Sequence, residues 1–350
     1  MSRPYAILRA GFPYHKTIGA RQRTVLPNDL TIAPDGTIYT LCRGTSYGKG
    51  GPGPIYITNL EDEYIGSFGW QGKRDPLGHA QMHWPCQIAI DGRGLLYVSD
   101  QAQDFIQVFT RDGHYLHRFG GEGSPGPGRF NRPSGLAVDA EDNVYVDDSL
   151  NHRIQKFDKD GRFISMFGSL GSEPGQFNMP WGIHVDSEND EIHVADWRND
   201  RVQVFDMNWE FQFQFGESGS GKGQFNRPTG IAVDKDGDIY VCDWGNSRVQ
   251  LFDKTGRYIQ QFLGDATLSK QEIEVFLRRR SMKQLRLRIE ADNEQEKLFA
   301  GPRSVRVDSK GHMFVVEADH YRVQVYKKQA IHMTELDVAP PLKVPTMNQN

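Results

Sequence analysis

Short runs in which apolar and polar residues alternate occupy most of the chain, separated by turns rich in Gly, Asp and Asn. In residues 229–262, Ile231 alternates with Val233 and Ile239 with Val241, and Asp-Gly and Thr-Gly pairs stand between the runs. A period of two is typical of strands with one buried face, and such pairs are typical of hairpin turns. The segment therefore predicts a four-stranded antiparallel sheet.

One phrase introduces this pattern three times. It reads Pro127-Gly-Arg-Phe-Asn-Arg-Pro133, Pro174-Gly-Gln-Phe-Asn-Met-Pro180 and Gly223-Gln-Phe-Asn-Arg-Pro228, and it recurs every 47 or 48 residues. The prolines that open successive units are Pro27, Pro85, Pro133, Pro180, Pro228 and Pro302. A repeat of this length built from strands predicts an all-β fold, a β-propeller with six blades.

The last unit, Pro302 to Lys327, contains only three strand-like runs. At the other end of the chain, residues 5–11 imitate the fourth runs at Tyr64–Gly69 and Tyr115–Gly120. We therefore expect residues 5–10 to form the outer strand of the sixth blade. Closing the ring in this way protects sheet edges that would otherwise be exposed.

The composition supports one globular unit. A chain of 350 residues in a single repeat array can bury a large core, so we expect one domain over residues 1–335 and a flexible tail at 336–350. Three cysteines, an odd number, and no apolar signal segment indicate reduced thiols and a cytoplasmic location. The net charge of −4 disfavours a nucleic-acid partner, and no apolar run is long enough to cross a membrane.

A second motif follows the second strand of the regular units. Its copies are Asp148-x-x-Asn151-x-Arg153, Asp196-x-x-Asn199-x-Arg201 and Asp243-x-x-Asn246-x-Arg248. They resemble the NHL repeat, which implies a six-bladed propeller of the kind used for protein or RNA binding, or for the lyase step of peptide amidation. By themselves the residues are interpreted as scaffold, because Asp and Asn cap tight turns and Arg can pair across the turn.

The resemblance to the amidating lyase can be followed residue by residue. That enzyme holds zinc on histidines, two of which follow blade-opening prolines. In this chain the residues that follow those prolines are Asn28, Cys86, Ser134, Trp181, Thr229 and Arg303. Arg43 matches an arginine of the lyase pattern. The segment Pro27-Asn28-Asp29 also resembles six-bladed calcium-dependent lactonases, so zinc and calcium are the metals these resemblances imply, and no specific cofactor is predicted.

The blades differ in how closely they keep the repeat. Blades three to five have a glycine two residues after the opening proline, whereas the other blades carry Asp29, Gln87 and Ser304 there. Glu317 replaces the turn aspartate of blade six. Because the ring closes, blades six, one and two are neighbours. Loops vary without disturbing a sheet, so we expect function on this half, at the face where the first strands begin.

The longest spacing between opening prolines lies before Pro302. The extra segment begins with the capping-box pattern Ser269-Lys-Gln-Glu272, and apolar residues at helical spacing follow. We expect one or two helices within residues 269–299, lying as a lid over the functional face. The basic residues of this segment, from Arg278 to Arg288, fit either a solvated helix paired with the acidic stretch after it or a surface for an anionic partner.

These departures define the candidate site. The expected ligand-binding residues are Asn28, Arg43, Cys86, Gln87, Trp181, Arg303 and Ser304, and the expected catalytic residues are Asp29, Arg43 and Glu317. Two arginines suit a carboxylate or phosphate, and either carboxylate could act as a base. The chain is therefore interpreted as a module that binds a small anionic molecule or a protein or peptide, with a lyase or hydrolase acting in the channel as the alternative. In a third interpretation, these residues only satisfy one another around a water-filled channel.

Overall fold

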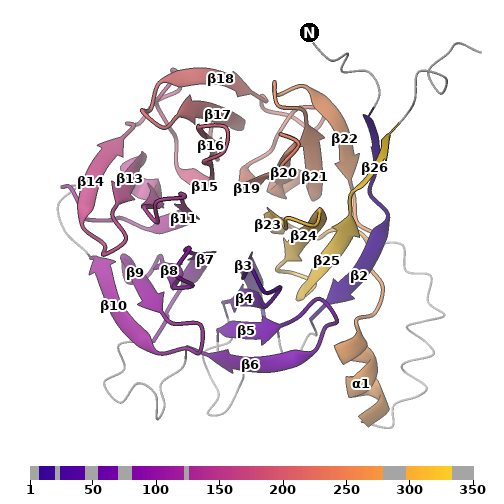
Figure 1. The fold of residues 1–350 in the computed structure, drawn as a ribbon. Helices are drawn as coiled ribbons and strands as arrows, with labels where there is room; N and C mark the ends of the chain where they lie inside the picture. The colour runs from indigo at the N-terminus through magenta and orange to yellow at the C-terminus, as the bar shows by residue number, and fades with distance from the viewer. Residues whose placement is uncertain are drawn as a thin grey trace, which may run out of the picture.

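The computed structural model describes residues 8–19, 24–43, 54–69, 81–121, 126–278 and 297–332. Six four-stranded antiparallel sheets stand around a central axis and close into a ring, as Figure 1 shows. The prediction of a six-bladed β-propeller is confirmed.

In five blades the four strands follow one another along the chain, and the first strand is the innermost. Blades one and two consist of β3 (Pro27–Ile32), β4 (Ile38–Cys42), β5 (Ile55–Thr58), β6 (Tyr64–Phe68), β7 (Pro85–Ile90), β8 (Leu96–Asp100), β9 (Phe105–Phe109) and β10 (Tyr115–Gly120). Blades three and four consist of β11 (Pro133–Val138), β12 (Val144–Asp148), β13 (Arg153–Phe157), β14 (Phe163–Phe167), β15 (Pro180–Asp186), β16 (Glu191–Asp196), β17 (Arg201–Asp206) and β18 (Phe211–Phe215). Blade five consists of β19 (Pro228–Val233), β20 (Ile239–Asp243), β21 (Arg248–Phe252) and β22 (Tyr258–Phe262).

Apolar side chains of adjacent blades pack face to face between the sheets. The cluster between blades three and four, for example, joins Tyr145 to Ile183. Phe177, from the repeated phrase, is fully buried against Gly168, where an added Cβ would lie 2.6 Å from the phenyl ring. In blades three to five, the phrase therefore fits the blade onto the glycine at the end of the outer strand of the blade before it.

The Asp-x-x-Asn-x-Arg motif is a hydrogen-bonded hub, as its interpretation as scaffold predicts. In blade four, Asp196 Oδ2 accepts from Asn199 Nδ2 at 2.8 Å and from Arg201 Nε at 2.9 Å. Its Oδ1 accepts from the backbone N–H of Asn178 at 2.7 Å. Blades three and five repeat the arrangement. The hub ties the turn after the second strand to the segment that enters the blade.

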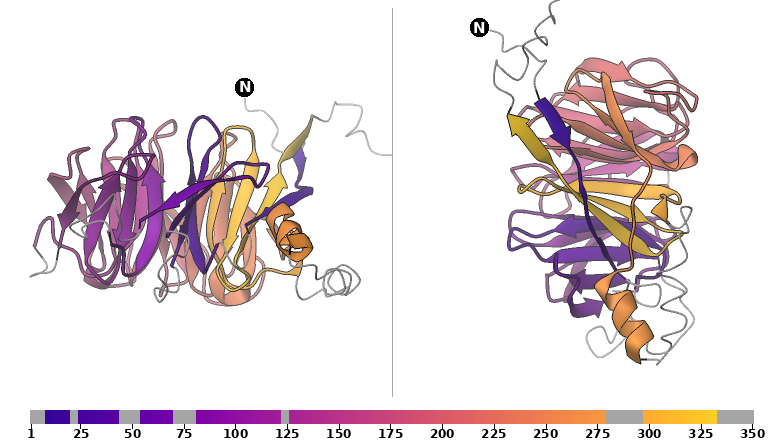
Figure 2. Two further views of the ribbon diagram at one scale, coloured as in Figure 1. Left: turned by 90° about the horizontal axis from the view of Figure 1, so that it is seen from below. Right: turned by 90° about the vertical axis from the view of Figure 1, so that its right-hand side faces the viewer.

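An N-terminal strand closes the ring, but it lies later in the chain than expected. Blade six consists of β23 (Pro302–Val307), β24 (His312–Glu317), β25 (Arg322–Lys327) and, as its outer strand, β2 (Tyr14–Ile18). Upstream, β1 (Leu8–Gly11) pairs instead with β26 (Gln329–His332) in a separate two-stranded ribbon that Figure 2 shows beside the ring. The expectation for residues 5–10 is corrected accordingly.

The terminal glycine explains the correction. Gly19, directly after β2, has a φ of 95°, and Gly69 and Gly120, at the ends of other outer strands, have φ of 103° and 97°. This left-handed conformation is open to glycine at little cost. Gly11 does not adopt it. Of the two Tyr-to-Gly segments near the N-terminus, residues 14–19 are therefore the ones that fit the outer position.

The insertion before blade six contributes the helix α1 (Lys270–Arg278), and the predicted capping box is formed. The N–H of Glu272 donates to Ser269 Oγ at 3.0 Å, and the N–H of Ser269 donates to Glu272 Oε2 at 3.3 Å. The N–H of Gln271 donates to Asp62 Oδ2 at 3.0 Å, and the N–H of Gly19 donates to Asp62 Oδ1 at 2.9 Å. The helix thus locks the seam between blades six and one.

This position corrects the predicted lid. Figure 1 shows α1 outside the ring, beside β2 and β6, so the described part of the insertion does not cover the mouth of the channel. Residues 279–296, the remainder of the predicted lid, and the predicted tail at 336–350 lie outside the described residues. Within the described part of the chain, no helix is long and apolar enough to cross a membrane.

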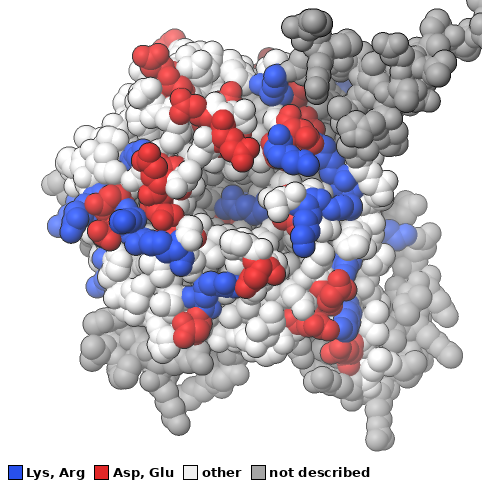
Figure 3. Space-filling view, viewed as in Figure 1, with Lys and Arg blue, Asp and Glu red and all other residues white. Residues whose placement is uncertain are grey.

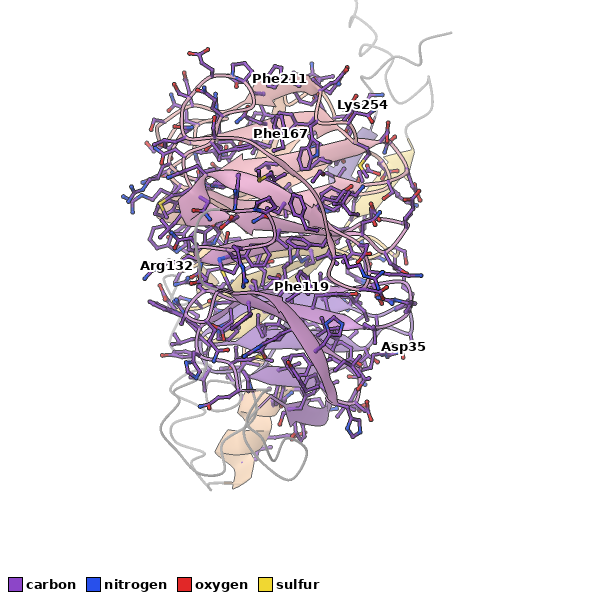
Figure 4. The ribbon with its side chains drawn as sticks, turned by 90° about the vertical axis from the view of Figure 1, so that its left-hand side faces the viewer. Asp35, Phe119, Arg132, Phe167, Phe211 and Lys254 are labelled. Carbon is purple, nitrogen blue, oxygen red and sulfur yellow. The ribbon has the colours of Figure 1, made fainter. Side chains whose placement is uncertain are left out.

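The two faces of the ring carry different loops. Figure 4 shows Asp35 and Lys254, in turns within blades one and five, at one edge of the molecule and Arg132, just before β11, at the opposite edge. We call the face on which the first strands begin the mouth face and the other the turn face. On the turn face acidic and basic side chains are interspersed around a central hollow (Figure 3), as in the ion pair between Arg111 and Asp35 at 2.5 Å.

Candidate functional site

Six β-bulges build the mouth of the ring. In every blade the ladder between the first and second strands shifts register just after the opening proline, for example between Pro180 and Gly182. A bulge frees a residue from regular pairing and re-aims its side chain. The residues placed in this way are Asn28, Cys86, Ser134, Trp181, Thr229 and Arg303.

Two kinds of side chain alternate around the mouth. Asn28, Ser134 and Thr229 each donate a hydrogen bond to the carbonyl of the next blade's opening proline, at 2.8, 3.3 and 3.4 Å. These bonds tie blades one, three and five to their neighbours. Blades two, four and six carry Cys86, Trp181 and Arg303, which make no such bond within the described part of the chain. The side chains at these three positions do not join neighbouring blades, so they can serve another function.

Three arginines gather on one side of the mouth. The guanidinium of Arg43, directly after β4, lies 4.1 Å from the centroid of the Trp84 ring, and that of Arg132 lies 5.4 Å from the same ring. Burial, reinforced by the charges of Arg303 and Arg132, lowers the pKa of Arg43 to about 10. Arg43 therefore stays protonated at neutral pH, and this side of the mouth is electropositive.

Two of these arginines hold donors without acceptors. Arg43 Nε and Arg303 Nε are both buried, and neither has a hydrogen-bond partner among the described residues. A buried donor left unpaired costs about 1–3 kcal/mol, and more for a charged group. Both guanidinium groups therefore keep an unused hydrogen-bond donor, as far as the described residues are concerned.

Cys86 lies close enough to both arginines for their charges to act on its thiol. The thiol is buried and free, and burial raises its pKa to about 12, although Arg43 and Arg303 oppose the shift. It is therefore neutral at physiological pH. We interpret Cys86 as an uncharged wall of the site, because a nucleophilic cysteine needs a thiolate.

Three further predicted site residues join neighbouring inner strands. Asp29 is fully buried, and its Oδ2 accepts from the N–H of Ile88 at 3.0 Å and from Arg306 Nη2 at 2.6 Å. Its Oδ1 accepts from Ser304 Oγ at 2.5 Å. Gln87 Oε1 accepts from a backbone N–H of blade three at 3.0 Å. Asp29 is thus occupied by bonds that link blades six, one and two, which favours a structural role over a role as a base.

The glycines at the same position in blades three to five have a steric cause. A Cβ at Gly182 would lie 1.8 Å from the carbonyl oxygen of Thr229, and one at Gly230 would lie 2.7 Å from Cα of Ser304. The inner strands approach too closely there for any side chain. Asp29, Gln87 and Ser304 were candidate functional residues because they replace these glycines. Their hydrogen bonds provide another way of joining inner strands.

Glu317 takes the place of the hub aspartate in blade six. Its Oε1 accepts from Arg322 Nε at 2.8 Å and from Gln324 Nε2 at 2.6 Å, and its Oε2 accepts from the N–H of Ala300 at 3.1 Å. The carboxylate is buried within these bonds. Its geometry favours the scaffold role that Asp196 has in blade four.

Asp147 is a buried acid that the sequence analysis did not single out. Both of its carboxyl oxygens are buried without a hydrogen-bond partner among the described residues. Burial raises the pKa of Asp147 well above its ordinary value, so the group is held neutral. Gly135 makes room for it, since a Cβ there would lie 1.9 Å from Asp147 Oδ2 and 3.0 Å from the carbonyl oxygen of Trp181.

The sequence analysis also did not identify Trp84 and Arg132 as candidate site residues. Each stands directly before an opening proline. Their position beside residues already expected to line the mouth was therefore the sequence feature that could have identified them. Arg132 belongs to the repeated phrase, and its regularity suggested scaffold. Its contact with Trp84 joins blades two and three and appears only in three dimensions.

The donor set does not fit the metals that the sequence resemblances imply. Among the described residues, no group of three or more His, Cys, Asp or Glu side chains is arranged to hold a metal ion. Asn28, the residue a lactonase-like site would use, donates through Nδ2 to the carbonyl of Pro85, next to Cys86, and its buried Oδ1 has no partner among the described residues. A cation there would meet the positive charges of the arginine cluster.

Fold and site together define a six-bladed β-propeller whose mouth is basic on one side. Residues 130–157, 177–205 and 225–252 match the family model of the NHL repeat, and they are the repeats of blades three, four and five. The chain therefore contains NHL repeats, as their motif indicates. Comparison of the sequence with curated proteins found no match.

Solved structures of similar shape are also propellers or proteins of unknown function. Streptogramin B lyase has a TM-score of 0.55 at 10% identity, covering 94% of this chain and 100% of its own. A catalytically inactive variant of virginiamycin B lyase from Staphylococcus aureus, solved with quinupristin, has 0.55 at 12%, covering 91% and 99%. A protein of unknown function from Bacteroides thetaiotaomicron has 0.57 at 16%, covering 92% and 76%. At these identities the likeness concerns the fold alone.

Proposed function

We propose that this propeller binds a small anionic ligand at its mouth, through Arg43 and Arg303. The observation that carries the proposal is the pair of buried Nε donors that find no acceptor among the described residues. A carboxylate or phosphate would satisfy both and neutralise charge that repels within the cluster. A carboxylate borne by a peptide or protein partner would use the same donors.

The packing of Arg43 suits this role. Its guanidinium lies over the face of Trp84, which holds the plane of the group and leaves its edge for hydrogen bonds. Such an edge binds a carboxylate or phosphate with two parallel bonds. Because the group is already half-buried and oriented, little conformational entropy is lost when the anion binds.

Binding is favoured over turnover by the state of the two carboxylates that the sequence analysis predicted to be catalytic. A lyase or hydrolase in this channel would need a base, and Asp29 and Glu317 already accept hydrogen bonds on both oxygens. Cys86 is a neutral thiol because burial raises its pKa to about 12. We therefore propose a binding role and assign Arg43 to recognition.

Calorimetric titration with inorganic phosphate, succinate and citrate tests the proposal. We expect one ligand per chain for at least one probe, with affinity that falls as salt is added. Arg43→Gln and Arg303→Gln should each weaken binding by about tenfold or more, because each removes a charged bidentate donor.

Arg257→Gln is the matched control. Arg257 pairs with Asp253 at 3.0 Å in a turn-face hairpin, and its side chain is 73% exposed. Its loss should leave affinity unchanged. Absence of binding by all three probes, or equal affinity in wild type and both mouth variants, would refute the anion site.

A further inference from the structure

The two sides of the mouth differ chemically. Arg43 belongs to blade one, and Arg303 and Cys86 come from the blades that flank it. Trp181 comes from blade four, which is three blades away in a ring of six and therefore opposite blade one. Among the bulge residues, the mouth thus carries Arg303 beside Arg43 on one side and a tryptophan on the other.

Trp181 is held in a defined position. Its ring stacks on Trp197, with centroids 5.6 Å apart and planes 30° apart. Trp197 is held in turn by Arg227 and Arg198, whose guanidinium groups lie 4.9 and 5.6 Å from its ring. Trp181 is only half-buried, so part of it remains open to a ligand. A rigid aromatic side chain loses little freedom on binding.

The other bulge residues offer no comparable surface. Ser134 and Thr229, on either side of Trp181 around the ring, turn their hydroxyls to backbone carbonyls and are buried. Asn28 has a buried Oδ1 without a partner among the described residues, on the basic side. Among the six bulge residues, Trp181 therefore offers the flat apolar surface.

We propose that the ligand is an organic anion with a flat apolar body, such as an aromatic acid. Its carboxylate or phosphate binds Arg43 and Arg303, and its ring packs on Trp181. The inference rests on the proposed anion site and adds a second contact, which gives the ligand a fixed orientation across the mouth.

Two matched pairs of probes test the inference by calorimetry. The first pair is methyl phosphate and 2-naphthyl phosphate, and the second is acetate and 2-naphthoate, so that each pair keeps its acid group and changes its body. We expect the naphthyl member of at least one pair to bind about tenfold more tightly or better. The pair that binds identifies the acid group. The methyl ester of 2-naphthoate, which keeps the body without the charge, should not bind.

Variants separate this inference from the anion site itself. Trp181→Leu, which keeps apolar volume without a flat ring, should remove the naphthyl preference and leave binding of the small anions intact, whereas Trp181→Phe should retain most of the preference. Arg43→Gln combined with Arg303→Gln should abolish binding of all four anions.

If wild type binds both members of each pair with nearly equal affinity, the aromatic contact is overturned and the anion site stands. This comparison does not depend on the folding of any variant. A preference that survives in Trp181→Leu would place the ring elsewhere and also overturn the inference. If no probe binds, the proposed anion site fails and the inference fails with it.

Discussion

Blades three to five and blades six, one and two are built from the same strands but joined in different ways. In the first group inner strands meet at glycines, and at Gly182 a side chain would collide with the next blade's backbone. In the second group Asp29, Gln87 and Ser304 bridge the inner strands through hydrogen bonds. Close backbone contact needs no side-chain chemistry, whereas side-chain bridges hold the half of the ring that includes the seam. The basic side of the mouth lies on that second half.

Removing the seam strand should have the largest effect. Deleting residues 1–19 removes β2 and leaves β25 as an exposed edge, so we expect the melting temperature to fall by about 10 °C or more, or cooperative melting to be lost. Deleting residues 1–10 removes only part of the β1–β26 ribbon and should change it little. Calorimetric melts of both truncations check this, and equal melts would contradict the assignment of β2 as the closing strand.

Adding a single methyl group should destabilise blades three to five, in which inner strands meet at glycines. Gly182→Ala places Cβ where the carbonyl oxygen of Thr229 now lies, so we expect a loss of about 3 kcal/mol or more in the free energy of unfolding. Gly11→Ala is the control, since nothing lies within 4 Å of a Cβ there. Urea unfolding followed by fluorescence measures both. A tolerated Gly182→Ala would mean that inner strands can separate without cost.

Losing the carboxylate of Asp29 should destabilise blades six, one and two, in which side chains bridge the inner strands. Asp29→Ala leaves Arg306 without its partner at 2.6 Å and removes acceptors from Ser304 and Ile88, so we expect a loss of about 3 kcal/mol. In a double-mutant cycle, Arg306→Ala should cost much less in the Asp29→Ala background than in wild type. The folded variant should keep its anion affinity. Affinity that is lost while stability is kept would instead give Asp29 a role in the site.

The smallest effect should come from Asp147, between blades three and four. Its pKa is raised in the folded state, so the folded protein binds one more proton than the unfolded chain above the ordinary pKa of about 4. Stability contributed by the neutral acid is therefore complete at low pH and is lost as the pH rises towards the folded pKa. Asp147→Asn keeps the shape without ionising, so it should be more stable than wild type by about 1 kcal/mol or more at pH 8.

That advantage should shrink as the pH falls to 4 and below, because wild-type Asp147 then becomes neutral in the unfolded state as well. Urea unfolding of both proteins across this range measures it. A difference that does not change with pH would show that Asp147 is not the group that titrates.

Local regularity was enough to predict the scaffold. The spacing of opening prolines predicted six blades because the same unit recurs along the chain. The Asp-x-x-Asn-x-Arg turns predicted the hubs, and Ser269 with Glu272 predicted a helix start, because each of these depends on residues a few positions apart. The outer strand of blade six was misplaced because two segments near the N-terminus share the same pattern. Only the backbone conformation at Gly19 distinguishes them.

Four residues of the proposed site were selected from the sequence. Cys86, Trp181 and Arg303 were chosen because they follow opening prolines, and the bulges place them at the mouth. Arg43 was chosen because it stands at the end of a second strand. Replacement of a glycine by a polar residue looks the same in sequence whether that residue binds a ligand or bridges two strands. The hydrogen bonds of Asp29 favour the second explanation, and they join residues from three different blades.

The number of blades, the strands of the first five blades and the turn hubs follow from the sequence alone, because they depend on periodicity and on short-range hydrogen bonding. The folded ring was needed to show which strand closes it, where the inserted helix lies and which polar side chains have no partner among the described residues. Burial and the pairing of buried donors depend on contacts between blades, and those contacts join residues that the chain keeps far apart.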